Sequence, residues 1–302
     1  MKKKTRREFL RSSSIVASLA AFSSSKLFND KTILYLKTNT SDTKISLIHS
    51  GGLNGARHNP DQLGGLEAIQ AQLLSSPSSR IFLDSGNLIN PDQSIGDNLE
   101  FLNQMVKSGL NIATLGMNES NLPTKDLAYL VENSGLKILG NSLEKQGLVL
   151  GKTYFSRAVV QWGKYKIGVL PTRNATLSDI NRRGLELKLL FQCDLVIGLG
   201  PLPQEGNLTL LQRRHHEVYH YFVDANDQLP VGTHVFKSTK GIEFWMSKPG
   251  NQGKYLGAFE YTLNSAYQLR HFANLSFMPG EASWNKKMAF LAQSSQLSNP
   301  QS

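Results

Sequence analysis

The sequence has little cysteine, no long apolar run and no basic stripe, and each shortage excludes a class of protein. Its single cysteine, Cys193, excludes an intrachain disulfide framework and a zinc site built from cysteine thiolates. Because Cys193 follows an apolar stretch, we expect it to be buried as a small hydrophobic side chain. The apolar residues 15–22 form too short a run to span a bilayer as a helix. The 302 residues are 40% hydrophobic, enough for one large domain or two small ones.

Positive charge is concentrated at the start of the chain. The formal net charge is +10, and residues 1–26 alone hold seven Lys or Arg against one Glu. The rest of the chain carries only short basic pairs, such as Arg182-Arg183, without the interleaved aromatic residues of a nucleic-acid surface. We therefore expect a mildly basic solvated surface and no nucleic-acid partner.

Residues 1–26 have the composition of an export signal. A basic segment, KKKTRREFLR at residues 2–11, precedes the apolar residues 15–22 and several small residues. Within it, TRREFLR at residues 5–11 resembles the twin-arginine signal, in which a hydroxyl residue and two arginines precede Phe-Leu and a basic residue. The resemblance implies export in the folded state to the periplasm or cell envelope of a bacterium, with no membrane span after the signal is removed. An amphipathic basic helix is the alternative interpretation.

Strands and helices alternate along the next hundred residues, a pattern typical of a parallel sheet flanked by helices. The periodicity predicts strands over 44–48, 80–84, 111–115 and 137–139, and helices over 63–74, 96–109 and 124–135. Beyond residue 150 it predicts a hairpin over 154–162 and 165–170, a helix over 177–193 and a strand over 194–199. Further strands are predicted over 219–224, 233–238, 242–247, 256–263 and 271–278. No internal repeat and no compositional boundary marks a second domain.

Small polar residues follow several of these predicted strands. The stretch TLGMNESN at residues 114–121 is the clearest case, and it lies where ligands bind in open α/β sheets. The glycine pairs Gly51-Gly52 and Gly64-Gly65 leave backbone N–H groups that could hold a phosphate without metal. Ordinary turns are the alternative interpretation of both pairs.

In this order, the strand-end motifs resemble those of the metallophosphoesterase (calcineurin-like) domain of the 5′-nucleotidase family. HSGGLNG at 49–55 stands where the family has His-Thr-Asn-Asp-x-His-Gly, and DSGN at 84–87 where it has Asp-Ala-Gly-Asp. TLGMNE at 114–119 stands for Thr-x-Gly-Asn-His-Glu. Further matches are LGN at 139–141, LGPL at 199–202 and GKYLG at 253–257. The resemblance implies an α/β fold, a single-domain, four-layer α/β/β/α sandwich over residues 44–264. Residues 265–293 would extend it, and 294–302 would be a disordered tail.

The resemblance also places residues without metal-binding groups at the family's metal site. Family members hold two divalent metals that activate water for attack on phosphorus. The family's first Asp ligand falls on Gly52, its first His on Asn54 and its bridging Asp on Asn87. Its Asn ligand falls on Met117 and its catalytic His on Asn118. A later His falls on Pro201, and the final His-x-His pair falls near residues 225–227. Glycine has no ligating side chain, a thioether suits soft metals, and an amide cannot supply the bridging negative charge.

We therefore expect a pseudoenzyme with no cofactor, acting as a binding or scaffold subunit. Asp84, Glu119 and Asn141 are retained from the family pattern. The residues expected to line a binding site are Gly51, Gly52, Asn87, Asn118 and Asn141. The alternative is a phosphoester or nucleotide hydrolase whose divalent metal is held in a rearranged site by His58, Asp84 and Glu119.

Two partners follow from the resemblance. Full-length family members carry a second, C-terminal domain that binds the nucleotide base, and 302 residues leave no room for it. A separate chain that supplies this domain would suit a scaffold role. A nucleotide or phosphate, bound in the cleft that corresponds to the family's metal site, is the other expected partner.

Overall fold

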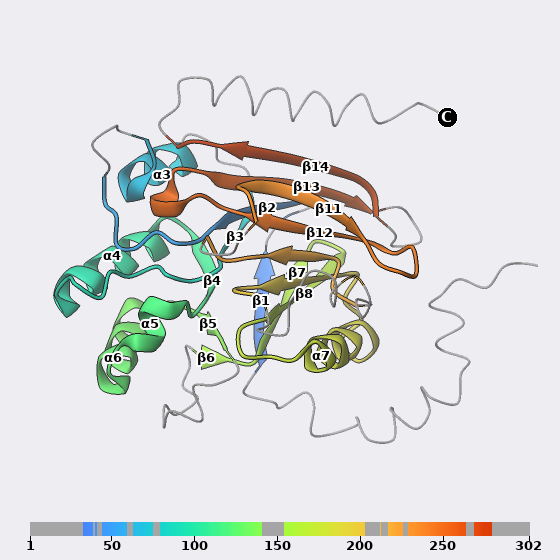
Figure 1. The fold of residues 1–302 in the computed structure, drawn as a ribbon, viewed down its shortest axis with the longest axis horizontal. Coiled ribbons are helices and arrows are strands. Elements are labelled where there is room, and N and C mark those ends of the chain that lie inside the picture. Colours follow the sequence, from blue (N-terminus) through green and yellow to red (C-terminus); the bar gives the residue numbers. More distant parts are fainter. Residues whose placement is uncertain are drawn as a thin grey trace, which may run out of the picture.

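Two seven-stranded sheets pack against each other between helices (Figure 1). The computed structural model describes residues 33–38, 40, 44–58, 63–74, 79–140, 154–202, 212, 217–225, 229–263 and 269–279. The predicted signal, most of the predicted extension and the predicted tail lie outside these residues. No helix within the described ranges is long and apolar enough to cross a membrane.

The first sheet has the strand order β1-β7-β8-β9-β10-β12-β11. Its strands are β1 (Ile33–Thr38), β7 (Arg157–Trp162), β8 (Tyr165–Pro171), β9 (Leu195–Leu199), β10 (His220–Phe222), β12 (Glu243–Lys248) and β11 (Gly232–Lys237). Helix α7 (Leu177–Leu189) covers its outer face. The predicted hairpin is confirmed, because β7 and β8 are antiparallel neighbours.

The second sheet has the strand order β14-β13-β2-β3-β4-β5-β6. Its strands are β2 (Lys44–Ser50), β3 (Ile81–Asp84), β4 (Leu110–Thr114), β5 (Ile138–Leu139), β6 (Tyr154–Phe155), β13 (Leu256–Leu263) and β14 (Leu269–Phe277). Strands β2 to β5 are parallel, as predicted, and β6 extends this parallel set. Strands β13 and β14 continue the sheet with antiparallel pairing. Helices α3 (Gly65–Leu74), α4 (Ile95–Lys107) and α6 (Thr124–Ser134) cover its outer face.

Three apolar clusters separate four layers. Ile69, Phe101 and Leu130 belong to the cluster between the helices and the second sheet. A second cluster fills the space between the sheets, and a third lies between the first sheet and α7. Cys193 is buried in this third cluster, and burial raises the pKa of its thiol to about 12. The predicted α/β/β/α order is therefore confirmed.

Three predicted boundaries are wrong. The fold begins before residue 44, because β1 pairs in parallel with β7 at the edge of the first sheet. The strand predicted over 154–162 is two strands, since β6 belongs to the second sheet and β7 to the first. A single residue, Ser156, separates the two strands, so the sequence pattern does not mark the crossing. Helix α7 ends at Leu189 and not at Cys193, because Gln192 adopts a φ of 57° and leaves helical geometry.

A buried polar network joins the two sheets at their interface. His220 on β10 bonds through Nδ1 to Tyr261 Oη on β13 and through Nε2 to Ser247 Oγ on β12, both at 2.6 Å. His49 on β2 stacks on Phe222, with 4.6 Å between ring centroids. Burial lowers the pKa of His49 to about 3 and the pKa of His220 well below its usual value. We call His49, His220, Ser247 and Tyr261 the inter-sheet network.

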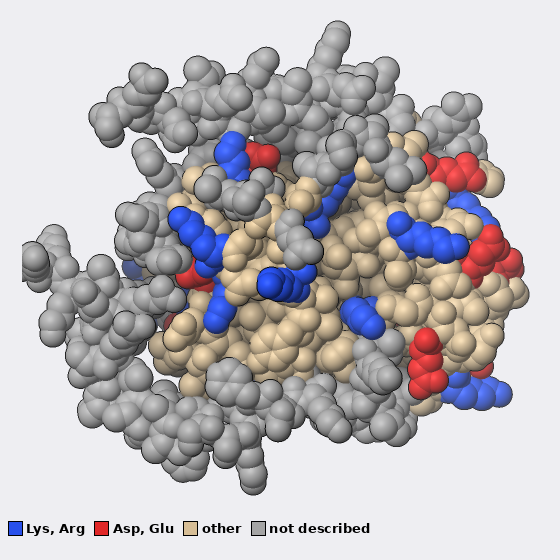
Figure 2. All heavy atoms as spheres, turned by 180° about the vertical axis from the view of Figure 1, so that it is seen from behind, with Lys and Arg blue, Asp and Glu red and all other residues tan. Residues whose placement is uncertain are grey.

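Charged side chains do not form a stripe on the face shown in Figure 2. Among the described residues there, Lys and Arg are scattered between uncharged residues, and Asp and Glu lie near some of them (Figure 2). This distribution agrees with the predicted, mildly basic solvated surface.

Candidate functional site

The loops that follow β2, β3 and β4 meet at one edge of the second sheet, as expected for the carboxyl ends of parallel strands. Gly52 N donates to Gly86 O, and Asn54 N donates to Asn87 O, both at 2.8 Å. The chain after β10 of the first sheet reaches the same place, because Asn87 Nδ2 donates to Asp224 Oδ2 at 2.5 Å. Both sheets therefore contribute to one polar site.

Amide side chains connect these loops in a row. Asn118 Nδ2 donates to Asn54 Oδ1 at 2.8 Å, and Asn118 N donates to Asn87 Oδ1 at 3.0 Å. Asn54 and Asn87 have φ angles of 52° and 56°, a backbone conformation that asparagine adopts more readily than most residues. We call Asn54, Asn87, Asn118, Glu119 and Asp224 the strand-end network.

Glu119 lies buried in the short helix α5 (Met117–Asn121) and receives three backbone hydrogen bonds. Its Oε2 accepts from Gly116 N at 2.6 Å and from Asn87 N at 3.0 Å. Its Oε1 accepts from Ile89 N at 3.0 Å. Burial raises the pKa of Glu119, and these hydrogen bonds oppose that rise. The carboxylate therefore fastens two loops to each other.

Asp84, the other retained carboxylate, is buried at the end of β3. Its Oδ2 accepts from Ser50 Oγ at 2.5 Å, and its Oδ1 accepts from Gly86 N at 2.8 Å. Burial raises the pKa of Asp84 to about 7. The carboxyl group thus holds the β3 turn and links it to β2.

Gly52 brings loops from opposite sheets into direct contact. Its φ is 64°, and a Cβ added to it would lie 2.6 Å from Ala225 Cβ and 3.0 Å from Asn251 Oδ1. Atoms in a packed protein interior do not approach each other that closely without displacing a neighbour. A side chain at Gly52, such as the aspartate of the family pattern, therefore has no space.

Arg173 is a site residue that the sequence motifs do not reveal. It lies between β8 and α7 and reaches over the turn before α5. Its Nη1 is 3.4 Å from Leu115 O, and its Nη2 is 3.1 Å from Met117 Sδ. Met117 is 55% exposed. The only sequence signal for Arg173 is its place just beyond a predicted strand, at the same edge where the other polar residues gather.

Solved structures share this arrangement of sheets and helices. A 5′-nucleotidase precursor from Thermus thermophilus aligns with 84% of this chain at 17% identity and a TM-score of 0.63. The NAD nucleotidase of Haemophilus influenzae aligns with 78% at 14% identity and a TM-score of 0.61. A calcineurin-like phosphoesterase of Bacillus subtilis, YfkN, aligns with 78% at 15% identity and a TM-score of 0.53. The chain has a metallophosphoesterase-like fold.

These likenesses concern the fold and not the reaction. The chain spans 59% of the Thermus protein, 50% of the Haemophilus protein and 90% of the Bacillus protein. No protein-family model and no curated protein sequence matches the chain. A shared fold at this identity carries many functions, so activity has to be argued from the site.

The predicted phosphate cradle of this metallophosphoesterase-like fold is filled by protein. Gly64 N donates to Pro279 O at 2.9 Å, and Gly52 N donates to Gly86 O. At the start of α3, the N–H groups of Leu66 and Glu67 donate to the carbonyls of residues 56 and 57. These bonds are consistent with the turn interpretation of the glycine pairs, and an anion bound to these N–H groups would have to displace them.

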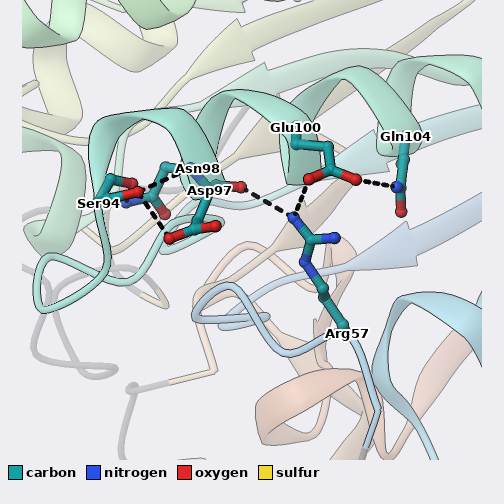
Figure 3. Close-up of polar contacts among 6 residues, drawn as sticks. All are labelled: Arg57, Ser94, Asp97, Asn98, Glu100 and Gln104. Atoms are coloured by element: carbon teal, nitrogen blue, oxygen red, sulfur yellow. Dashed lines mark hydrogen bonds and ion pairs between the residues drawn. The ribbon is translucent and has the colours of Figure 1, made fainter.

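The rearranged metal site around His58 does not form. His58 is exposed, and its Nδ1 lies 3.5 Å from Glu67 Oε1. Its neighbour Arg57 ties the same loop to α4 by donating to Glu100 Oε2 at 2.9 Å and to Asp97 O at 3.3 Å (Figure 3). Within the described ranges, no three His, Cys, Asp or Glu residues are placed to hold a metal ion. The donor set therefore does not fit the divalent metals that the fold family implies.

Two remaining predicted positions add no ligating group. Pro201 has no side-chain donor, and its carbonyl accepts from Thr172 Oγ1 at 2.7 Å. Gly200, which precedes it, has a φ of 109° and leaves room for Thr114. Asn141 lies outside the described residues.

Proposed function

We propose that this protein is an exported, metallophosphoesterase-fold pseudoenzyme that acts as a binding or scaffold subunit. The contact between Gly52 and Ala225 is the observation that carries this proposal. In the family pattern both positions belong to metal-ligand motifs, and here the two backbones close on each other. A dinuclear phosphoesterase needs anionic ligands and space for two cations about 4 Å apart.

The strand-end network supports the same conclusion. Asn87, at the bridging position, uses its Oδ1 to accept from Asn118 N and its Nδ2 to donate to Asp224. Glu119 is occupied by three backbone N–H groups. Polar groups that would face metals in an enzyme of this fold instead bond to one another, as buried polar groups must when no ligand satisfies them.

A hydrolase assay tests the loss of catalysis. We expect purified protein to show no turnover of a generic phosphodiester, bis(p-nitrophenyl) phosphate, with or without added Mn²⁺. The competing function, a hydrolase with a rearranged site, requires turnover that disappears in Glu119→Ala. Glu132→Ala, at an exposed glutamate on α6, serves as the matched control. Turnover kept by Glu132→Ala and lost by Glu119→Ala would contradict the proposal.

The scaffold role requires a partner in the cell envelope. We propose a separate chain of the kind that the resemblance suggests, which carries the family's second domain, with a nucleotide or phosphate as the small-molecule alternative. Cross-linking in native extracts, followed by purification, should recover a complex of defined size. A lone monomer in cross-linked extracts would argue against a scaffold. Thermal shift on addition of nucleotide or phosphate tests the small-molecule alternative.

The proposal of export depends on the signal at residues 1–26, and replacing both arginines of its arginine pair tests it. In the variant Arg6→Lys with Arg7→Lys, we expect the protein to remain in the cytoplasmic fraction, because the signal depends on the arginine pair. The wild-type chain should reach the periplasm or envelope. Equal distribution of the two chains would contradict twin-arginine export.

A further inference from the structure

Two buried carboxylates of the strand-end network, Glu119 and Asp224, accept hydrogen bonds from neutral donors. Glu119 accepts hydrogen bonds from backbone N–H groups, and Asp224 accepts one from the Asn87 amide. Neutral donors orient and stabilise an anion, but they leave its net charge in place. Buried negative charge is costly unless a positive group lies nearby. In an active member of the fold family, metal ions would supply that positive charge.

Arg173 is placed to supply it here. Its guanidinium lies over the turn from Leu115 to Met117, with Nη1 directed at Leu115 O and Nη2 at Met117 Sδ. Glu119 fastens the same turn through Gly116 N. Burial lowers the pKa of Arg173, while attraction to Glu119 and Asp224 opposes that fall.

We propose that Arg173 is the internal cation of this site and replaces the positive charge of the family's metals. It balances Glu119 across the Leu115–Gly116 peptide, whose carbonyl oxygen faces Arg173 and whose N–H donates to Glu119. A guanidinium suits this position because it is weakly hydrated and stays protonated when partly buried. The inference rests on the proposed metal-free function, and it is tested by stability rather than activity, so the two can fail separately.

Chemical rescue of Arg173→Ala tests the proposal. We expect the melting temperature of this variant to fall by about 4–8 °C, because the buried Glu119 carboxylate loses its counter-charge. Guanidinium chloride at about 20 mM, far below denaturing concentrations, should recover a large part of that loss by binding in the vacated space. Urea at the same concentration has a similar shape but no charge and should recover none. Sodium chloride at the same ionic strength controls for screening.

Arg183→Ala on α7 is the matched control. Arg183 is also a half-buried arginine, but its neighbour Glu186 keeps ion pairs with Arg157 and Arg182, so guanidinium should not rescue its loss. Arg173→Lys keeps the charge and should melt closer to the wild type than Arg173→Ala does.

Three results would overturn the proposal. They are an Arg173→Ala melting temperature equal to that of the wild type, equal shifts with guanidinium and urea, and an Arg173→Lys variant as unstable as Arg173→Ala. If Arg173→Ala does not fold, Arg173→Lys decides: a folded variant supports the role of charge, and an unfolded one overturns it.

Discussion

The strand-end network and the inter-sheet network are both buried and hydrogen-bonded, yet they are built from different chemistry. The inter-sheet network joins neutral side chains, chiefly His220, Ser247 and Tyr261, across the two sheets. The strand-end network contains the carboxylates of Glu119 and Asp224 and relies on backbone donors and amides. Carboxylates are therefore present in the strand-end network and absent from the inter-sheet network.

This difference indicates how the site can be stable without metals. In the strand-end network, Asn118 bonds to the side-chain amides of Asn54 and Asn87, so these amides are satisfied by protein groups. Glycine at position 52 lets the two loops touch. The core network needs no such replacement, because the neutral His220 side chain bonds to both Tyr261 and Ser247.

Gly52→Asp should have the largest effect on stability, because it places the residue of the family pattern where Gly52 contacts Ala225. We expect a loss of about 3 kcal/mol in the free energy of unfolding, from positive-φ strain and from overpacking against Ala225. Denaturant unfolding measures it. Gly241→Asp is the control, since Gly241 has a φ of 76° with no atom within 4 Å of an added Cβ. Equal losses in the two variants would show that strain alone is responsible and that the site is not closed.

Glu119→Gln should have the next largest effect. The amide offers one acceptor atom in place of two, so at least one of the three backbone N–H groups faces an NH₂ group. We expect a loss of about 2 kcal/mol, measured by denaturant unfolding. Glu132→Gln, at an exposed position on α6, should change stability little. Similar losses in both variants would contradict the fastening role of Glu119.

His49→Gln should change the pH dependence of stability. The pKa of His49 is about 3 in the folded chain and near 6.5 in the unfolded chain, so the unfolded state binds more protons between these values. Stability present above pH 6.5 is therefore lost as pH falls. We expect the variant to reduce this acid slope by up to about 1.4 kcal/mol per pH unit and to leave the slope at higher pH unchanged. An unaltered acid slope would contradict the burial of His49 as a neutral side chain in the inter-sheet network.

Arg57→Ala should have the smallest effect of these substitutions. Arg57 bonds to Asp97 O and to Glu100 at the surface of α4, where solvent screens the ion pair (Figure 3). We expect the melting temperature to change by no more than about 2 °C. A loss as large as that of Glu119→Gln would mean that this loop, and not the buried carboxylate, fixes the site.

The sequence predicts most of the fold because its layers follow from periodicity. The alternation of apolar residues identifies β2, β3 and β4 and the helices between them. It does not identify β1, because this is a short edge strand in which only Ile33 and Leu34 are buried. It merges β6 with β7, because a single residue, Ser156, separates them.

The site could be predicted only as far as its motifs reach. Asp84, Asn118 and Glu119 lie in stretches that follow predicted strands, so they could be assigned to one edge. Asp224 ends a predicted strand and is not singled out by the sequence, and it meets Asn87 across 137 residues of sequence. Contacts of this kind depend on how the two sheets stack, which local patterns do not encode.

The metal content of the folded protein tests the central claim most directly. The protein would be purified without chelators, dialysed against Mn²⁺ and then against metal-free buffer, and analysed by inductively coupled plasma mass spectrometry. We predict far less than one metal ion per chain, because Gly52 and Ala225 close the space and Asn87 supplies no bridging charge. One or two tightly held metal ions per chain, lost in Glu119→Ala, would contradict the account.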